Sequence, residues 1–136
     1  MNHKGTRTPR PIPKATDLVA RQVVDAAFAV HSTLGPGLIE SVYERCLCHE
    51  LAERGLDFKR QLSLPVLYKG VRLDGGLRLD LLVADRVIVE LKTVEAITGV
   101  HKAQLLTYLK LTECRLGLLI NFNVPRIRDG IVRLAL

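Results

Sequence analysis

The apolar residues between positions 17 and 55 recur at helical spacing. They occupy positions 20, 23, 24, 27, 30 and 34, and then 39, 42, 43, 46, 47 and 51, which is the rhythm of amphipathic helices. Gly35-Pro36-Gly37 separates the two runs, and Gly55 follows the second run where a C-terminal cap belongs. The pattern therefore predicts two helices, with Thr16 as the N-cap of the first.

From Phe58 onward the chain changes to short apolar runs separated by turn residues. Lys69-Gly70 is expected to join the short runs 66–68 and 71–73 as a hairpin. The runs 77–83 and 87–91 are apolar on both faces, as central strands are. Helical spacing returns over 99–111, followed by a buried strand over 116–122 and an edge strand over 131–134. This order predicts one α/β domain over residues 15–136, with a mixed central β-sheet flanked by helices.

Residues 1–14 differ from the rest of the chain because they combine prolines and bases with no acid. We expect them to form a disordered basic arm, which either touches phosphates or only aids solubility. The net charge of +6 favours polyanionic partners. Four of these charges lie in the arm, so the remaining residues carry a net charge of only +2.

The cysteines and the hydropathy pattern indicate in which cellular compartment the protein is expected. The three cysteines, Cys46, Cys48 and Cys114, lack paired CxxC spacing, which argues against a disulfide framework and a zinc site. The first apolar stretch is interrupted by polar residues at 21, 22 and 25, so it fits neither a signal peptide nor a membrane span. A cytoplasmic protein with reduced cysteines and no membrane partner is the expectation.

Three charged residues converge in the predicted hairpin between the two central strands. If Val83 and Val87 flank a three-residue loop, Asp80 lies opposite Glu90, and Lys92 shares the face of Glu90. Two carboxylates across a buried ladder need a neutralising cation. An oxygen-only donor set suits Mg²⁺, but an exposed salt bridge with Lys92 at the sheet end fits the spacing equally well.

Polar side chains on two of the helices extend this cluster. Glu40 and Tyr43 stand one turn apart at the start of the second helix, and His101, Gln104 and Tyr108 share one face of the third. Each also has a structural interpretation: Glu40 as an acid favoured by the helix dipole, Tyr43 as core, and Gln104 with Tyr108 as a surface pair. A structural role is also favoured for His31, near the end of the first helix.

Together these stretches resemble the GxxExxY proteins, a group within the PD-(D/E)XK nuclease superfamily, over nearly the whole chain from about Asp17 to Leu134. The matching segments are 30–37, the motif residues Gly37, Glu40 and Tyr43, and then 79–83, 89–92, 104–110 and 117–122. The chain departs from the pattern at Leu79, which replaces the proline of the superfamily name, and at Asn123, where glycine is common.

The resemblance implies a restriction-endonuclease-like core and hydrolysis of phosphodiester bonds, with DNA rather than RNA as substrate. It implies catalytic roles for four charged residues: Glu40, Asp80, Glu90 and Lys92. Mg²⁺, or Mn²⁺ in its place, would bind the carboxylates of Asp80 and Glu90 and the carbonyl of Leu91. Three side chains would border the substrate: Tyr43, Gln104 and Tyr108. A catalytically silent module that binds nucleic acid or protein is the alternative, and a homodimer is left open.

Overall fold

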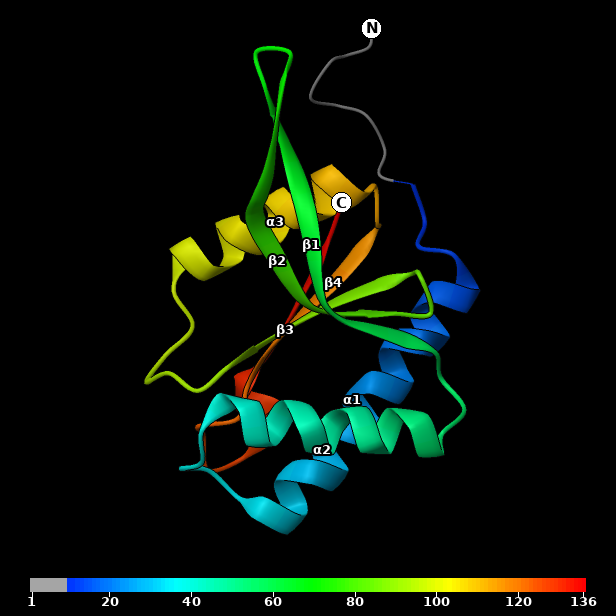
Figure 1. Ribbon diagram of the computed structural model, residues 1–136. Coiled ribbons are helices and arrows are strands. Elements are labelled where there is room, and N and C mark those ends of the chain that lie inside the picture. The colour runs from blue at the N-terminus through cyan, green and yellow to red at the C-terminus, as the bar shows by residue number, and fades with distance from the viewer. Residues whose placement is uncertain (1–9) are drawn as a thin grey trace, which may run out of the picture.

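The computed structural model describes residues 10–136 as a five-stranded sheet with helices on both faces (Figure 1). The strand order is β1-β2-β3-β4-β5, and only β3 and β4 run parallel. The strands are β1 (Phe58–Tyr68), β2 (Val71–Val83), β3 (Val87–Lys92), β4 (Leu116–Asn121) and β5 (Ile131–Ala135). The helices are α1 (Lys14–Leu34), α2 (Glu40–Glu53) and α3 (Gly99–Thr112), with a short 3₁₀ turn at Ile127–Gly130. The predicted mixed α/β sheet is confirmed.

The core consists of two apolar layers, one on each face of the sheet. Residues of α1 and α2, such as Val23 and Leu47, pack against one face. Leu105 and Leu109 of α3 pack with Ile88 and other sheet residues on the opposite face. Each helix thus buries its apolar stripe on the sheet, as the helical spacing required. Cys46, Cys48 and Cys114 are free cysteines.

The start of α1 differs from the prediction. The helix begins at Lys14 because the carbonyl of Pro13 already accepts the N–H of Asp17 in a first helical turn. Thr16 is therefore not the N-cap. It lies buried inside the first turn, where its hydroxyl accepts a hydrogen bond from Arg86.

The folded part of the chain also reaches into the segment expected to be an arm. Arg115 donates hydrogen bonds to the carbonyls of Arg10 and Pro11, and Ile12 packs against the core. Residues 1–9, with most of the expected arm, lie outside the described residues.

The predicted end of α2 is confirmed. Gly55 has a positive φ of 76° and donates its N–H to the carbonyl of Ala52, while Leu56 donates to Leu51. This pair of bonds is the Schellman arrangement, which satisfies the last carbonyls of a helix.

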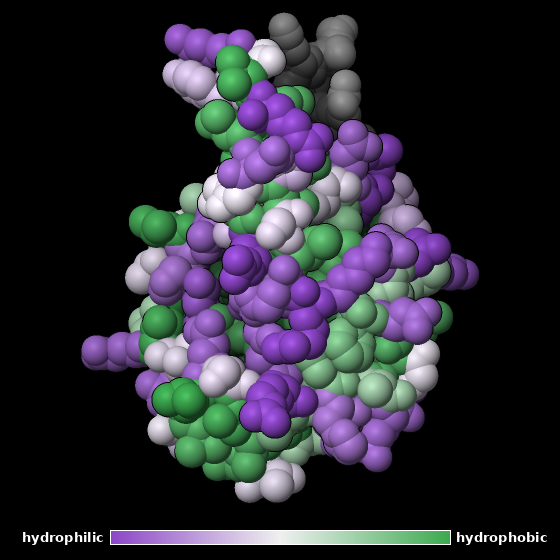
Figure 2. Space-filling model, in the orientation of Figure 1, coloured by the Kyte–Doolittle hydropathy of each residue, from purple (hydrophilic) through white to green (hydrophobic). Residues whose placement is uncertain are grey.

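The predicted hairpin at Lys69-Gly70 is confirmed, with φ of 50° and 80° at these two residues, as a type I′ turn requires. Its arms are much longer than the sequence indicated, and the hairpin projects beyond the body of the molecule (Figure 1). In Figure 2 it is a narrow projection on which hydrophobic and hydrophilic residues are mixed. The exposed apolar side chains include Leu67, Tyr68 and Val71.

The β1–β2 ribbon bends where it leaves the rest of the sheet (Figure 1). β2 pairs with β3 only through the segment 81–83, whereas it pairs with β1 over almost its entire length. At the bend, Gln61 of β1 has a φ of 50°, which is unfavourable for a residue with a β-carbon. Asp80 of β2 lies at the same corner, between the paired residues Leu79 and Leu81.

Candidate functional site

The predicted register between β2 and β3 is confirmed. Val83 pairs with Val87 and Leu81 with Val89, across a loop of three residues. At the next position, Asp80 and Glu90 are not paired through their backbones. Their carboxylates accept backbone N–H groups instead. The N–H of Asp80 donates to Oε2 of Glu90 at 2.8 Å, and the N–H of Leu91 donates to Oδ2 of Asp80 at 2.8 Å. We call these two acids the carboxylate pair.

The two acids of the carboxylate pair are largely shielded from solvent. Glu90 is 4% exposed and Asp80 is half-buried. Burial, together with the charge of Asp80, raises the pKa of Glu90 to about 8. Burial also raises the pKa of Asp80, although the hydrogen bond from Leu91 lowers it. Two carboxylates this close repel each other when both are charged, so the binding of a cation beside them is favourable.

The exposed salt bridge that the sequence had left open is not observed. Glu90 is buried rather than exposed. Within residues 10–136, no ion pair joins Lys92 to either acid at 4.0 Å or less. Lys92 is half-buried at the end of β3, and its charge still lowers the pKa of both acids. It is therefore close to the pair without neutralising it by direct contact.

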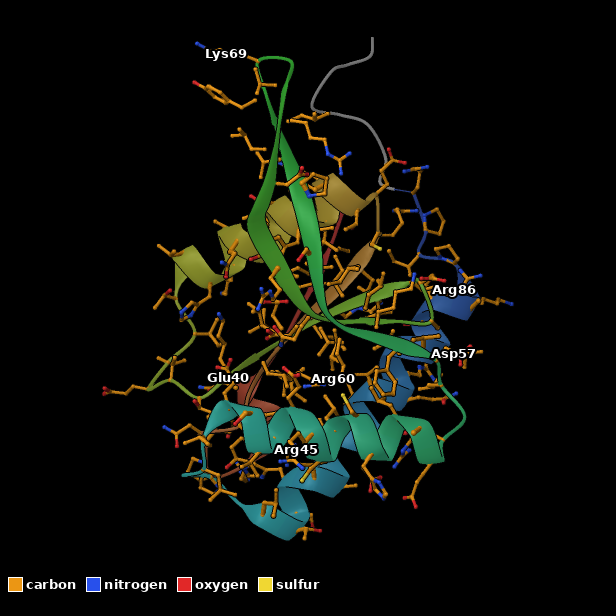
Figure 3. The ribbon with its side chains drawn as sticks, viewed as in Figure 1. Glu40, Arg45, Asp57, Arg60, Lys69 and Arg86 are labelled. Carbon is orange, nitrogen blue, oxygen red and sulfur yellow. The ribbon has the colours of Figure 1, made fainter. Side chains whose placement is uncertain are left out.

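Glu40 is the third acid at this site. It is the first residue of α2, and Figure 3 shows it at the N-terminal end of that helix. Burial raises the pKa of Glu40, the charge of Asp80 raises it further, and the charge of Lys92 lowers it. The structure thus brings together the four residues predicted to be catalytic, from two strands and one helix.

The face of α3 places Tyr108 beside the carboxylate pair. Tyr108 is almost fully buried, and burial and the charges of Glu90 and Asp80 raise the pKa of its hydroxyl. Gln104 lies one turn earlier on the same helix and is exposed. His101 has a structural task, since its Nδ1 accepts the N–H of Thr98 in a capping box at the start of α3.

Tyr43 does not lie where a substrate contact would. It is fully buried and stacks on Phe122, with ring centroids 4.5 Å apart. Its hydroxyl donates to the carbonyl of Gly35 and accepts the N–H of Leu38. The predicted substrate contact is therefore corrected to a core role, in which Tyr43 fixes the loop that leads to Glu40. His31 is likewise structural, since its ring is hydrogen-bonded to the carbonyl of Val124.

A fourth acid, Glu44, lies one turn after Glu40 and was not predicted from the sequence. Its side chain is 8% exposed and accepts hydrogen bonds from Arg60 and Gln61 of β1. The signal was present, because Glu44 shares helical spacing with the buried Leu47 and Leu51. A charge at a core position of an amphipathic helix indicates a specific partner.

Asn121 was missed as well. It pairs with Lys92 in the parallel ladder and is almost fully buried. Its side chain accepts the N–H of Val94 at 3.1 Å and donates to the carbonyl of Val94 at 2.9 Å. Asn121 thereby fixes the path of the chain just after Lys92. A polar residue at the end of an apolar strand was the available signal.

The donor set at the pair fits a hard divalent cation. Each carboxylate commits one oxygen to a backbone N–H, which leaves Oδ1 of Asp80 and Oε1 of Glu90 for an ion. The N–H and C=O of a strand residue point to the same edge, so the carbonyl of Leu91 also faces the edge that β2 has left. Residues 10–136 hold no cluster of three or more ligating His, Cys, Asp or Glu side chains. Mg²⁺ does not need one, because it keeps several waters and commonly binds one or two carboxylates.

Comparison with known proteins identifies the family of the chain. A family model described as the PD-(D/E)XK nuclease superfamily matches residues 17–134, a span that holds every site residue named above. No curated protein and no solved structure matches the chain. In the described part of the chain, the helices are too short or too polar to cross a membrane. The chain belongs to the PD-(D/E)XK nuclease superfamily.

Proposed function

We propose that this protein is a Mg²⁺-dependent nuclease that hydrolyses phosphodiester bonds in DNA, with Mn²⁺ as an effective substitute. The observation that carries the proposal is the carboxylate pair, in which Glu90 is buried and Asp80 half-buried at the point where two strands separate. Membership in a nuclease superfamily supports the class of reaction. The net charge of +6 supports a polyanionic substrate.

The carboxylates of Asp80 and Glu90 and the carbonyl of Leu91 would hold the ion. When bound, a divalent ion polarises the phosphate and lowers the pKa of a bound water. The positive charge of the ion would then balance the negative charges of Asp80 and Glu90, which offsets the electrostatic cost of burying Glu90.

The remaining residues act on the substrate. The Lys92 ammonium, beside the carboxylate pair, stabilises the negative charge that develops on the phosphate. Glu40 lies close enough to Asp80 and Lys92 to share their electrostatic environment, and it accepts a hydrogen bond from the attacking water. Tyr108, which is almost fully buried, borders the carboxylate pair from α3, and the exposed Gln104 one turn earlier contacts the nucleic-acid backbone.

Cleavage of supercoiled plasmid by the purified protein tests the proposal. Mg²⁺ or Mn²⁺ should support cleavage, EDTA should stop it, and RNA should be cut more slowly than DNA. Glu90→Ala and Lys92→Ala should each abolish cleavage, because one removes a metal ligand and the other a charge at the phosphate. Glu53→Gln, at an exposed position at the far end of α2, serves as the matched control. Cleavage that survives both site substitutions would overturn the proposal.

The alternative is a catalytically silent module that binds nucleic acid or protein. The lack of a three-residue ligand cluster among residues 10–136 is the observation in its favour. Such a module would bind DNA with an affinity that depends on salt but not on Mg²⁺ or on Asp80. Metal-dependent binding that is lost in Asp80→Ala would decide against it.

A further inference from the structure

Hydrogen bonds to the Glu44 side chain connect α2 to the bend in β1. Both of its carboxylate oxygens are used: Oε2 accepts Nε of Arg60 at 3.1 Å and Nη2 at 2.7 Å, and Oε1 accepts Nε2 of Gln61 at 2.8 Å. Figure 3 shows Arg60 between the strands and α2. We call these three residues the Glu44 anchor. The three hydrogen bonds hold the Glu44 carboxylate toward Arg60 and Gln61 of β1.

The Glu44 anchor connects the two parts of the chain that carry Glu40 and Asp80. Glu44 follows Glu40 by one turn of a continuous helix. Contacts that hold Glu44 in place therefore also hold the backbone of Glu40 in place. On the strand side, Arg60 pairs with Leu81, which places Gln61 opposite Asp80. The charge of Glu44 raises the pKa of Asp80 and that of Glu40, after the larger effect of burial on each, as expected for neighbouring groups.

Backbone geometry supports a positioning role over simple packing. Gln61 has a φ of 50°, a conformation that persists in residues with a β-carbon when the surrounding contacts hold it. Its amide bond to Glu44 is such a contact. The Arg60 side chain is half exposed, so its charge pairing with Glu44 contributes little to stability by itself. What the anchor supplies is the direction of three hydrogen bonds.

We propose that the Glu44 anchor is a positioning device, which holds Glu40 at the distance from Asp80 that metal binding and cleavage need. This inference rests on the proposed nuclease function. The anchor residues are positioning residues, since they act on the site through Glu40 and Asp80. Loss of residues that orient metal ligands typically lowers metal affinity or activity by about 10- to 100-fold.

Mn²⁺ binding by the metal-free protein, followed by electron paramagnetic resonance, tests the anchor together with plasmid cleavage. Glu44→Gln should weaken Mn²⁺ binding at least roughly 10-fold and lower kcat by a similar factor. Arg60→Met is the decisive variant. Loss of a positive charge near the site would strengthen cation binding if Coulomb attraction alone mattered, whereas loss of the anchor should weaken it. Arg60 is half exposed, so its removal leaves the core intact.

The matched controls are Glu50→Gln and Arg54→Met, which break an ion pair confined to the C-terminal part of α2. Both should bind Mn²⁺ and cleave as the unmodified protein does. If Arg60→Met binds Mn²⁺ as tightly as the unmodified protein or more tightly, the anchor proposal fails while the nuclease proposal stands. If the unmodified protein binds Mn²⁺ without cleaving DNA, and Arg60→Met weakens that binding, the nuclease proposal fails and the anchor stands. If the unmodified protein binds no Mn²⁺, both fail.

Discussion

At the scale of single residues, the register of one short hairpin decides most of the site. A three-residue loop between Val83 and Val87 was enough to predict that Asp80 and Glu90 face each other. The sequence did not show that each carboxylate would take a backbone N–H from the other strand. That exchange occurs where β2 stops pairing with β3, just before Leu81.

Glu90→Gln should stabilise the metal-free protein at high pH. The usual pKa of this group is 4.5, and in the folded protein it is about 8. Between these values the folded state holds a proton that the unfolded state has lost, so stability falls as pH rises and the full penalty is present above pH 8. Glutamine keeps an acceptor for the N–H of Asp80 and removes the charge. One pKa unit corresponds to about 1.4 kcal/mol, and the gain should be at least of this order.

Thermal unfolding in EDTA at pH 5 and pH 8.5 measures this effect. Glu90→Gln should melt higher than the unmodified protein at pH 8.5, and the difference should shrink toward pH 5. Glu53→Gln, an exposed position, should show no such dependence. A difference that is the same at both pH values, or a variant less stable at pH 8.5, would contradict the assigned environment of Glu90.

Tyr43→Phe separates a core residue from a substrate contact. Removal of the hydroxyl leaves the carbonyl of Gly35 and the N–H of Leu38 without this partner, at a cost of about 1–3 kcal/mol. Stacking on Phe122 is retained. Urea denaturation should show the loss, and the KM for DNA should not change. A raised KM with unchanged stability would restore the substrate contact predicted from the sequence.

At the scale of the elements, those that bury an apolar stripe could be predicted, and those that depend on distant contacts could not. The end of α1, the Gly55 cap of α2 and the hairpin turn were predictable because local residues determine them. The start of α1 was not, since Pro13 opens the helix before Thr16. The length of the hairpin arms was missed although apolar and polar residues alternate from Val71 to Leu81, because Gly75-Gly76 resembles a turn between two shorter strands.

Gly117→Ala should loosen the contact between β4 and α3. A β-carbon at Gly117 would lie 2.8 Å from Cδ1 of Leu105, inside the core. Overpacking of this kind costs about 1–3 kcal/mol, which urea denaturation would detect. Gly99→Ala at the start of α3 is the control, because a β-carbon there meets nothing within 4 Å. Equal stabilities of the two variants would show that α3 does not pack on β4 as described.

At the scale of the whole molecule, the fold places the site at a break in the sheet. The two apolar layers hold β3 and β4 at the centre, while the β1–β2 ribbon bends away, and the carboxylate pair lies where β2 and β3 stop pairing. The family could be predicted from the sequence because its motifs span nearly the whole chain, and the match over residues 17–134 confirms the superfamily. The Glu44 anchor could not, because it joins α2 to β1 through side chains alone.

The most direct test of the central claim is an anomalous diffraction map of crystals soaked in Mn²⁺. The account predicts one strong peak between Asp80 and Glu90, about 2.1 Å from a carboxylate oxygen of each, with the carbonyl of Leu91 among its ligands. The peak should vanish in Glu90→Ala. A soaked crystal with no peak between these two acids, or with manganese bound only elsewhere, would contradict the claim that the carboxylate pair is a metal site.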